Sequence, residues 1–504
     1  MSAQASSPEA IGRPLALVVR LLDKLEERGV RYCHWKSTTT LDLALTGRTD
    51  LDLLVHRSDA VAFDEVTREL DFKPFVSHES RRYPGVEDLL GYDQESGRLV
   101  HLHVYYQLLL GQQYVKNHRL PLEDAMLSAS VRRGPIRVPP PELEVVVLAL
   151  RTLLKYRDAD ALKDRLRLGR RGGIPPETLR ELEDLAARAD RAAIDEVVRH
   201  HLQGFPLDIV PRLLDLVGDD SRNAALLLEL RARAVDALRR YERLSAWEAR
   251  RIYAAARLSR AWPLRTVIRG LSRRETRRKS PRVGGVGVAL VGIDGAGKST
   301  VIDAITEWLA WRVNVAVLYM GSARPSTTTR GLKLVARAAR AFGRRVSLPG
   351  ARRAADLLTA IRYLWDARDR RRRADEGRRL AGRGVLVLYD RYPLPGARLG
   401  ERSIDGPRIR QLDGTAGSRL LRRLARLEER IHRRIAPPDC VILLRIPPDV
   451  ARQRKAIPDP EGAARKARAL ETMDRSGLRL VEVDATQPLD AVVRDVKRAI
   501  WGLL

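Results

Sequence analysis

The sequence predicts an α/β protein in three parts: a small N-terminal α/β domain, a helical spacer and a C-terminal parallel sheet with flanking helices. Short apolar strands alternate with helices at both ends of the chain, a pattern typical of βαβ units. A glycine-rich loop at 292–300 separates a strand from a helix, and the pattern between about 140 and 260 is helical throughout. We therefore expect domains at 1–130, 131–263 and 286–504, with a basic linker at 264–285.

Length and composition limit the class of protein. The chain has 504 residues, 44% of them hydrophobic, which is enough for about two to four packed domains. No apolar run approaches the roughly 18–20 residues that span a bilayer, and the N-terminus lacks a signal-peptide pattern. Cys33 and Cys440 are too few and too far apart for a metal cluster or a disulfide framework. We expect a soluble cytoplasmic protein with two buried thiols.

The strong positive charge has several interpretations. The chain has 93 Lys and Arg against 64 Asp and Glu, a formal net charge of +29. Most of these cations alternate with acids at helical spacing, which favours solvated helix faces. Aromatic residues are only 5% of the chain and do not interleave with the basic stretches, so no specific nucleic-acid partner is expected. Weak contact with an anionic membrane surface stays open, and the oligomeric state is not predicted.

The first 263 residues predict one α/β unit followed by helices. An amphipathic helix at 16–29 ends at a glycine, and a helix after the prolines at 139–141 opens the helical region. The segment 245–279, with Trp247 and Trp262, is either a packing helix that runs into the linker or a basic surface helix. Between the first helix and residue 130 we expect strands at 31–35, 50–56 and 98–106 and a helix at 59–72.

The last 219 residues predict a parallel sheet. Five apolar strands alternate with helices there, one of which begins near 298 and another at 448, and the chain ends in a helix. The expected strands lie at 286–293, 313–320, 384–390, 439–446 and 478–484.

The glycine-rich loop has the pattern G-x-x-x-x-G-K-[ST], with Gly292, Gly297, Lys298 and Ser299 at the fixed positions. Glycines let successive backbone N–H groups surround a phosphate. The lysine can then reach the β- and γ-phosphates, and the serine hydroxyl can bind Mg²⁺ at a helix N-terminus. We expect ATP and Mg²⁺ as cofactors, with further loop contacts from Asp294, Gly295, Ala296 and Thr300.

A second apolar strand, GVLVLYDRY, ends in a carboxylate. Its Asp390 would lie at the carboxyl edge of the sheet, where a carboxylate helps to hold Mg²⁺ through water. Arg391 would point the same way, toward a phosphate acceptor.

These residues resemble the thymidylate kinase family of nucleoside monophosphate kinases, whose loop reads G-x-D-G-x-G-K-[ST] and whose later strand closes in D-R-[YH]. PPDCVILLRIPPDVARQR at 437–454 resembles the family stretch that ends in a lid arginine, here Arg454. VDATQP at 483–488 resembles the loop against the adenine base and contains Thr486. Over about 220 residues, the resemblance implies a phosphotransferase whose catalytic residues are Lys298, Asp390, Arg391 and Arg454.

The acceptor half departs from that family. LYMGSARPSTTTRG at 318–331 replaces the Arg-Glu-Pro-Gly segment, and the residues after the D-R-Y lack the thymine-recognition segment. The acceptor is therefore either a nucleoside monophosphate or another hydroxyl or phosphate, such as one on a sugar or secondary metabolite. Arg324, Arg330 and Arg408 are either phosphate ligands or ordinary surface arginines.

An N-terminal carboxylate pair suggests a second chemistry. Asp50 and Asp52 lie two apart on an expected strand, hence on one face, where two carboxylates can hold Mg²⁺. With Trp35-Lys36-Ser37 before them, residues 15–125 resemble the nucleotidyltransferase superfamily, although Lys36 replaces a glycine and His101 a carboxylate. The domain is either active or kept for binding. His34, His56 and His103 are interpreted as packing or surface residues.

Three functions follow from these patterns. The first is an ATP- and Mg²⁺-dependent kinase of the thymidylate kinase type, fused to a nucleotidyltransferase-like domain and acting on a small phosphate acceptor. The second is a nucleotide-binding regulatory module with degenerate sites. The third is an active N-terminal nucleotidyltransferase.

Overall fold

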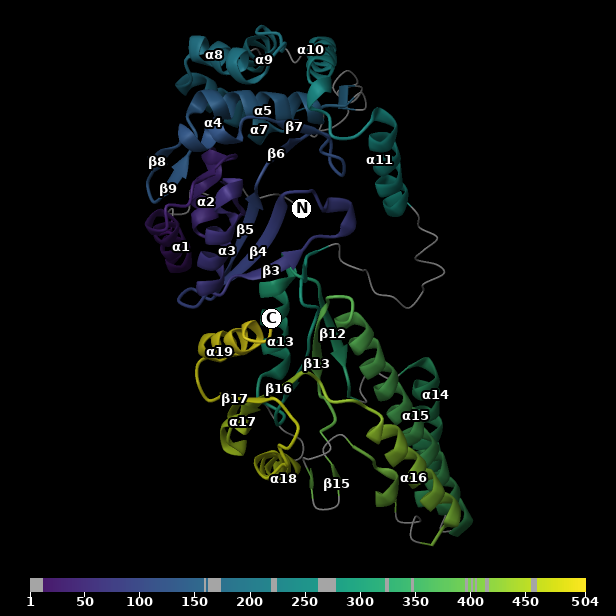
Figure 1. Ribbon diagram of the computed structural model, residues 1–504. Helices are drawn as coiled ribbons and strands as arrows, with labels where there is room; N and C mark the ends of the chain where they lie inside the picture. The colour runs from purple at the N-terminus through teal and green to yellow at the C-terminus, as the bar shows by residue number, and fades with distance from the viewer. Residues whose placement is uncertain are drawn as a thin grey trace. The chain divides into compact units, whose positions relative to one another are not determined.

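The computed structural model has two compact units, Met1–Glu275 and Thr276–Leu504, and each is described by itself. Figure 1 labels their helices and strands. The structure describes residues 12–157, 160–161, 174–218, 224–261, 278–321, 326–345, 349–394, 398–399, 402–403, 406–412, 417–454 and 460–504.

A mixed sheet forms the centre of the first unit. Its strands follow the order β1-β2-β5-β4-β3, and only the β2–β5 pair is parallel. The expected strands in β1, β2 and β5 are present, but β3 and β4 were not expected, because charged residues, proline and glycine interrupt their apolar pattern. The bounds are β1 Tyr32–His34, β2 Leu51–Val55, β3 Lys73–Val76, β4 Val86–Asp93 and β5 Arg98–Tyr105.

Alternation along β2 divides its side chains between two hydrophobic cores. Leu51, Leu53 and Val55 pack with helices α1 (Ala16–Glu27) and α3 (Ala60–Glu69). Leu54 and Tyr105, on the opposite face, join the core of the helical region. The remaining elements of this unit are α2 Leu41–Leu45, α4 Glu123–Ser128, α5 Pro141–Lys155, α7 Pro176–Arg188, α8 Arg191–His201, α9 Ile209–Gly218, α10 Ala224–Ala237, α11 Ala246–Ala261, β6 Leu108–Leu110, β7 His118–Leu120, β8 Val131–Arg133 and β9 Ile136–Val138, with 3-10 turns at Thr38–Thr40, Arg57–Asp59, Glu79–Arg81 and Arg239–Tyr241.

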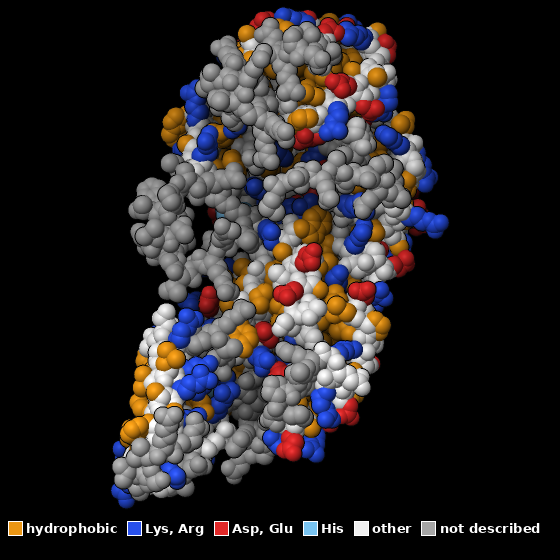
Figure 2. All heavy atoms as spheres, turned by 180° about the vertical axis from the view of Figure 1, so that it is seen from behind, with side chains coloured by type: hydrophobic (Ala, Val, Ile, Leu, Met, Phe, Trp, Pro, Cys, Tyr) orange, Lys and Arg blue, Asp and Glu red, His pale blue; other side chains and the backbone are white. Residues whose placement is uncertain are grey.

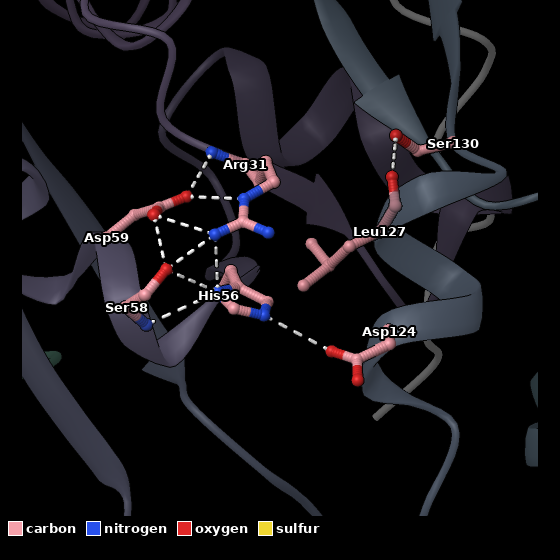
Figure 3. Close-up of polar contacts among 7 residues, drawn as sticks. All are labelled: Arg31, His56, Ser58, Asp59, Asp124, Leu127 and Ser130. Carbon is pink, nitrogen blue, oxygen red and sulfur yellow. Dashed lines mark hydrogen bonds and ion pairs between the residues drawn. The ribbon is translucent and has the colours of Figure 1, made fainter.

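A polar network joins the edge of this sheet to α4 (Figure 3). Arg31 donates from Nε to Asp59 at 2.9 Å, and its Nη2 lies 2.7 Å from Nδ1 of His56. The other ring nitrogen of His56 lies 3.3 Å from Asp124 on α4. His56 therefore bridges Arg31 and Asp124.

A parallel sheet forms the centre of the second unit, as predicted. Its strand order is β12-β13-β11-β16-β17, and every neighbouring pair is parallel. In Figure 1, α13 (Lys298–Ala310) and α19 (Leu489–Trp501) lie on one side of these strands and α15 (Pro349–Ala381) lies on the other. The strands are β11 Gly287–Val291, β12 Val315–Tyr319, β13 Leu386–Asp390, β16 Cys440–Arg445 and β17 Leu480–Asp484.

Long helices pack beside this sheet. Helix α14 (Thr327–Arg345) contacts α15, and α15 contacts α16 (Arg419–Arg433). The end of the expected linker belongs to this unit, because the backbone N–H of Lys279 donates to Arg312 at 2.9 Å. Residues 264–277 of that linker, and Trp262, lie outside the described residues. The other elements are β10 Ser280–Pro281, β14 Arg398–Leu399, β15 Arg402–Ser403, α17 Pro448–Arg454, α18 Pro460–Glu471 and a 3-10 turn at Ile409–Gln411.

Cys33 on β1 and Cys440 on β16 are buried free thiols, as predicted. Within the part of the chain that the structure describes, none of the helices combines the length and apolarity needed to cross a bilayer.

His432 gives a prediction about acid stability. Burial, with Arg370 and Arg408 nearby, lowers the pKa of His432 to about 3. The unfolded chain, with an ordinary histidine pKa near 6.5, takes up a proton that the folded chain resists. The free energy of unfolding should therefore fall as the pH drops from about 6.5 toward 3. Urea titrations at pH 7 and pH 5 should show a smaller fall in His432→Leu than in wild type. The exposed control His200→Leu should behave like wild type. An equal fall in the free energy of unfolding between pH 7 and pH 5 in all three proteins would contradict the prediction.

Candidate functional site

The glycine-rich loop follows the central strand of the second unit and leads directly into α13. Gly295 and Gly297 have φ values of +89° and +80°, which side-chain-bearing residues rarely adopt. A Cβ on Gly295 would also lie 2.7 Å from the carbonyl oxygen of Ala451 on α17. Gly292 adjoins the next strand, since a Cβ there would lie 2.9 Å from the carbonyl oxygen of Leu444. Glycine is therefore required by conformation and by close packing.

Lys298 begins α13, and its ammonium group turns back over the loop. Nζ donates to the carbonyl oxygens of Gly292 at 3.1 Å and Ile293 at 2.7 Å. Burial lowers the pKa of Lys298 to about 8, and the positive charge of Lys466 on α18 acts in the same direction. Among the described residues, two neutral carbonyls and the Asp294 carboxylate, 3.9 Å away, contact this buried cation, which is therefore well placed to exchange these partners for phosphate oxygens.

The magnesium candidates lie beside this lysine. Ser299 and Thr300, in the first turn of α13, are exposed. Asp390 ends β13, and its backbone pairs with Leu290 of β11, immediately before the loop. The Oδ1 atom of Asp390 is buried and has no hydrogen-bond partner among the residues that the structure describes. Because an unpaired buried carboxylate oxygen is costly, this group fits a bound cation.

Arg391 contacts the loop in this structure. Its φ of +62° is unusual for a residue with a side chain, and Nη2 donates to Oδ1 of Asp294 at 2.8 Å. Burial would raise the pKa of Asp294, but Arg391, Lys466 and Lys298 together lower it. Lys466 was not selected from the sequence, because its place beside the loop depends on how α18 packs.

Arg454 and Thr486 are brought together at the end of α17. The guanidinium of Arg454 donates to the carbonyl oxygens of Ala485 at 2.7 Å and Thr486 at 3.1 Å. The Thr486 hydroxyl in turn donates to Asp484 at 2.6 Å. Since Ala451, one turn earlier on α17, adjoins Gly295, the end of α17 and the segment at 485–486 lie on one side of the glycine-rich loop.

Two further arginines reach the carboxyl edge of the sheet from α15. Arg370 donates from Nε to the carbonyl oxygen of Met320 at 3.0 Å, and Arg373 donates to that of Tyr319 at 3.0 Å. The same edge holds Asp390, whose carbonyl accepts from the Met320 N–H at 2.8 Å. The sequence did not distinguish these two from the many other helical arginines.

Of the arginines suspected from the sequence, only Arg408 lies near either of these two α15 arginines among the described residues, since its charge and that of Arg370 both act on His432. Arg330 is exposed on α14, and Arg324 lies outside the described residues. The backbone N–H of Arg408 donates to Glu428 at 2.9 Å.

A second polar cluster lies on one sheet face of the first unit. Asp50 and Asp52 do share a face: Oδ1 of Asp50 lies 2.7 Å from His101, and Oδ1 of Asp52 lies 3.1 Å from His103. The third carboxylate comes from β4, where Asp88 lies 3.1 Å from the other ring nitrogen of His101. His103 and Asp88 were missed, the first because it was interpreted as a packing residue and the second because β4 was not expected.

Lysines dominate the electrostatics of this cluster. Lys36 lies 2.8 Å from Asp52 and donates to the Tyr105 hydroxyl at 2.9 Å. Burial would raise the pKa of Asp52, but Lys36 and His103 hold it below its ordinary value. Burial and the charge of Lys36 lower the pKa of Lys116 to about 7, and its ammonium group lies over the Tyr83 ring at 4.2 Å.

This cluster does not fit a magnesium pair. Asp52 is already neutralised by Lys36, and Asp50 is bound to His101. Over the described ranges, no group of three or more His, Cys, Asp and Glu side chains is arranged to hold a metal ion. Mg²⁺ also prefers carboxylate and water oxygens to imidazole nitrogen.

No family model matches this chain. The uncharacterized ATP-binding protein YghS of Escherichia coli (strain K12) is 26% identical over 236 residues, which cover 43% of this chain and 93% of that protein. A solved thymidylate kinase from Candida albicans covers 44% of this chain and 92% of its own, with 17% identity and a TM-score of 0.28.

Proposed function

We propose that the second unit is an ATP- and Mg²⁺-dependent phosphotransferase that transfers the γ-phosphoryl group of ATP to a small acceptor. The observation that carries the proposal is the complete glycine-rich loop, with Lys298 buried against it and Asp390 on the adjacent parallel strand. The relative from E. coli supports the nucleotide, since it is named an ATP-binding protein.

Each side chain has a role in this reaction. The loop amides and Lys298 would bind the β- and γ-phosphates, which attract the ammonium group away from its carbonyl partners. Ser299 and Asp390 would hold Mg²⁺, which when bound neutralises charge on the phosphates. Arg454 would close over the transferring group, because it is exposed at the end of a helix that contacts the loop.

The acceptor would bind at the carboxyl edge of β12 and β13. Arg370 and Arg373 already reach that edge, and Arg391 needs only to exchange Asp294 for an acceptor phosphate. Guanidinium groups bind phosphate in a bidentate manner, so an acceptor that already carries a phosphate fits best. Nucleoside monophosphates and sugar phosphates both meet this requirement.

In the direct test, the full chain is incubated with γ-labelled ATP, Mg²⁺ and a panel of nucleoside monophosphates, sugars and sugar phosphates. We expect label on one phosphorylated acceptor class. Tight ATP binding with no transfer to any acceptor would favour the nucleotide-binding regulatory module instead.

For the first unit, we propose a nucleotidyltransferase-like domain that binds an anionic ligand without a metal pair. The support is that the ammonium groups of Lys36 and Lys116 lie 4.8 Å and 5.2 Å from the centre of the same Tyr105 ring, where an anion would favour the charged form of both. Asp50→Ala should therefore leave the chain's enzymatic activities unchanged. With α-labelled nucleotides and Mg²⁺, we expect no Asp50-dependent transfer of label. Transfer by the wild type that disappears in Asp50→Ala would instead establish an active nucleotidyltransferase.

A further inference from the structure

Helix α14 exposes an apolar stripe. Leu334 and Phe342 are 64% and 61% exposed, and Val335 beside them is 52% exposed. Because Leu334, Ala338 and Phe342 are four residues apart, they lie on one face of the helix. Figure 2 shows orange side chains along the outer edge of this part of the molecule, at the lower left, with blue ones next to them.

The packing of α14 against α15 keeps this stripe exposed to solvent. The buried residues Thr329 and Ala336 lie on the opposite face. The Thr329 hydroxyl donates to Asp369 of α15 at 2.9 Å, and the Ser326 N–H donates to the same carboxylate at 3.1 Å. Rotating the helix to bury Leu334 and Phe342 would break these hydrogen bonds. The exposure of these two side chains is therefore a consequence of the fold.

One flank of the stripe is basic. Arg330, Lys333, Arg337 and Arg340 follow a spacing of three and four residues along the helix, which places them in one row. The sequence of α14 contains no acidic residue. An apolar face with a cationic border is the pattern of a helix that lies in the interface of an anionic membrane.

The positive charge of α14 favours an anionic membrane over the other possible binding partners. A second copy of the chain, docking α14 against α14, would bring the two basic rows together and incur like-charge repulsion. A nucleic acid would engage the cations but leave Leu334 and Phe342 in water. We infer that α14 binds the surface of an anionic lipid bilayer, with the stripe inserted among the acyl chains and the basic row at the headgroups.

The test is flotation of the full chain with vesicles of phosphatidylcholine, with and without phosphatidylserine. The wild type should float with the anionic vesicles only, and raised salt should reduce binding. The double variant Leu334→Ser with Phe342→Ser should lower the partition coefficient by about tenfold, and Lys333→Glu with Arg337→Glu should do the same. Both should melt like the wild type, because the altered side chains are exposed.

The matched control is Val61→Ser, which removes a 72% exposed apolar side chain from α3 in the first unit. It should float like the wild type. The inference is overturned if the wild type does not bind anionic vesicles, or if the α14 variants bind them as well as the control does. It is also overturned if sedimentation shows a dimer that the Leu334 and Phe342 changes dissociate, since the stripe would then bind a second copy.

Discussion

Lys298→Ala should abolish ATP-dependent phosphorylation of the acceptor, with a fall in kcat/KM of at least about 10²–10³-fold. The ammonium group is the one cation at the start of α13, and burial in the loop makes its charge act in a poorly screened environment. Alanine leaves the glycine conformations of the loop unchanged, so the loss should be chemical rather than structural. The measurement is initial rates with γ-labelled ATP at saturating acceptor.

The control for this variant is Lys333→Ala, which removes an exposed lysine of α14. It should retain the wild-type rate toward a water-soluble acceptor. Melting curves should show that Lys298→Ala is folded, because it loses two hydrogen bonds to carbonyls and a 3.9 Å contact with Asp294 but also removes a charge whose burial is costly. Unchanged activity in folded Lys298→Ala would overturn the assignment of the loop.

Asp390→Asn should lower kcat by about 10²-fold and shift the Mg²⁺ requirement to higher concentration. Asparagine keeps the shape of the side chain but removes the charge of an oxygen that has no partner among the described residues. If that oxygen helps to hold the metal, the loss should be largest at low Mg²⁺ and smaller at high Mg²⁺. The measurement is a Mg²⁺ titration of the initial rate at fixed ATP.

Asp490→Asn is the matched control, since Asp490 is exposed in the first turn of α19. Its Mg²⁺ titration should superimpose on that of the wild type. A wild-type Mg²⁺ dependence in Asp390→Asn would remove Asp390 from the site and leave Ser299 as the sole candidate ligand.

The strand, turn and helix around the glycine-rich loop were predicted from the sequence because that feature is local. A strand, a glycine-rich turn and a helix N-terminus are contiguous, so Gly292, Lys298 and Ser299 could be placed by spacing alone. The parallel sheet was also predicted, because β11, β12, β13 and β16 are largely apolar segments, while β17 keeps an apolar pattern that only Glu482 interrupts. In the first unit, β4 was missed because acidic residues at its start, VED, hide its apolar pattern.

The sequence by itself thus determined the second unit's sheet, the position of its loop and the shared face of Asp50 and Asp52. These depend on periodicities of two and of 3.6 residues, which are properties of the local backbone. Only the tertiary structure decided which distant groups meet: Arg370 and Arg373 at the sheet edge, Lys466 beside the loop, and Lys36 on Asp52. Long-range strand pairing and helix packing bring these partners together, and burial then changes the pKa values of the buried groups among them. Because Lys36 contacts Asp52 and His101 contacts Asp50, a metal pair at these two carboxylates is unfavourable. The two-residue spacing of the carboxylates in the sequence could not reveal these contacts.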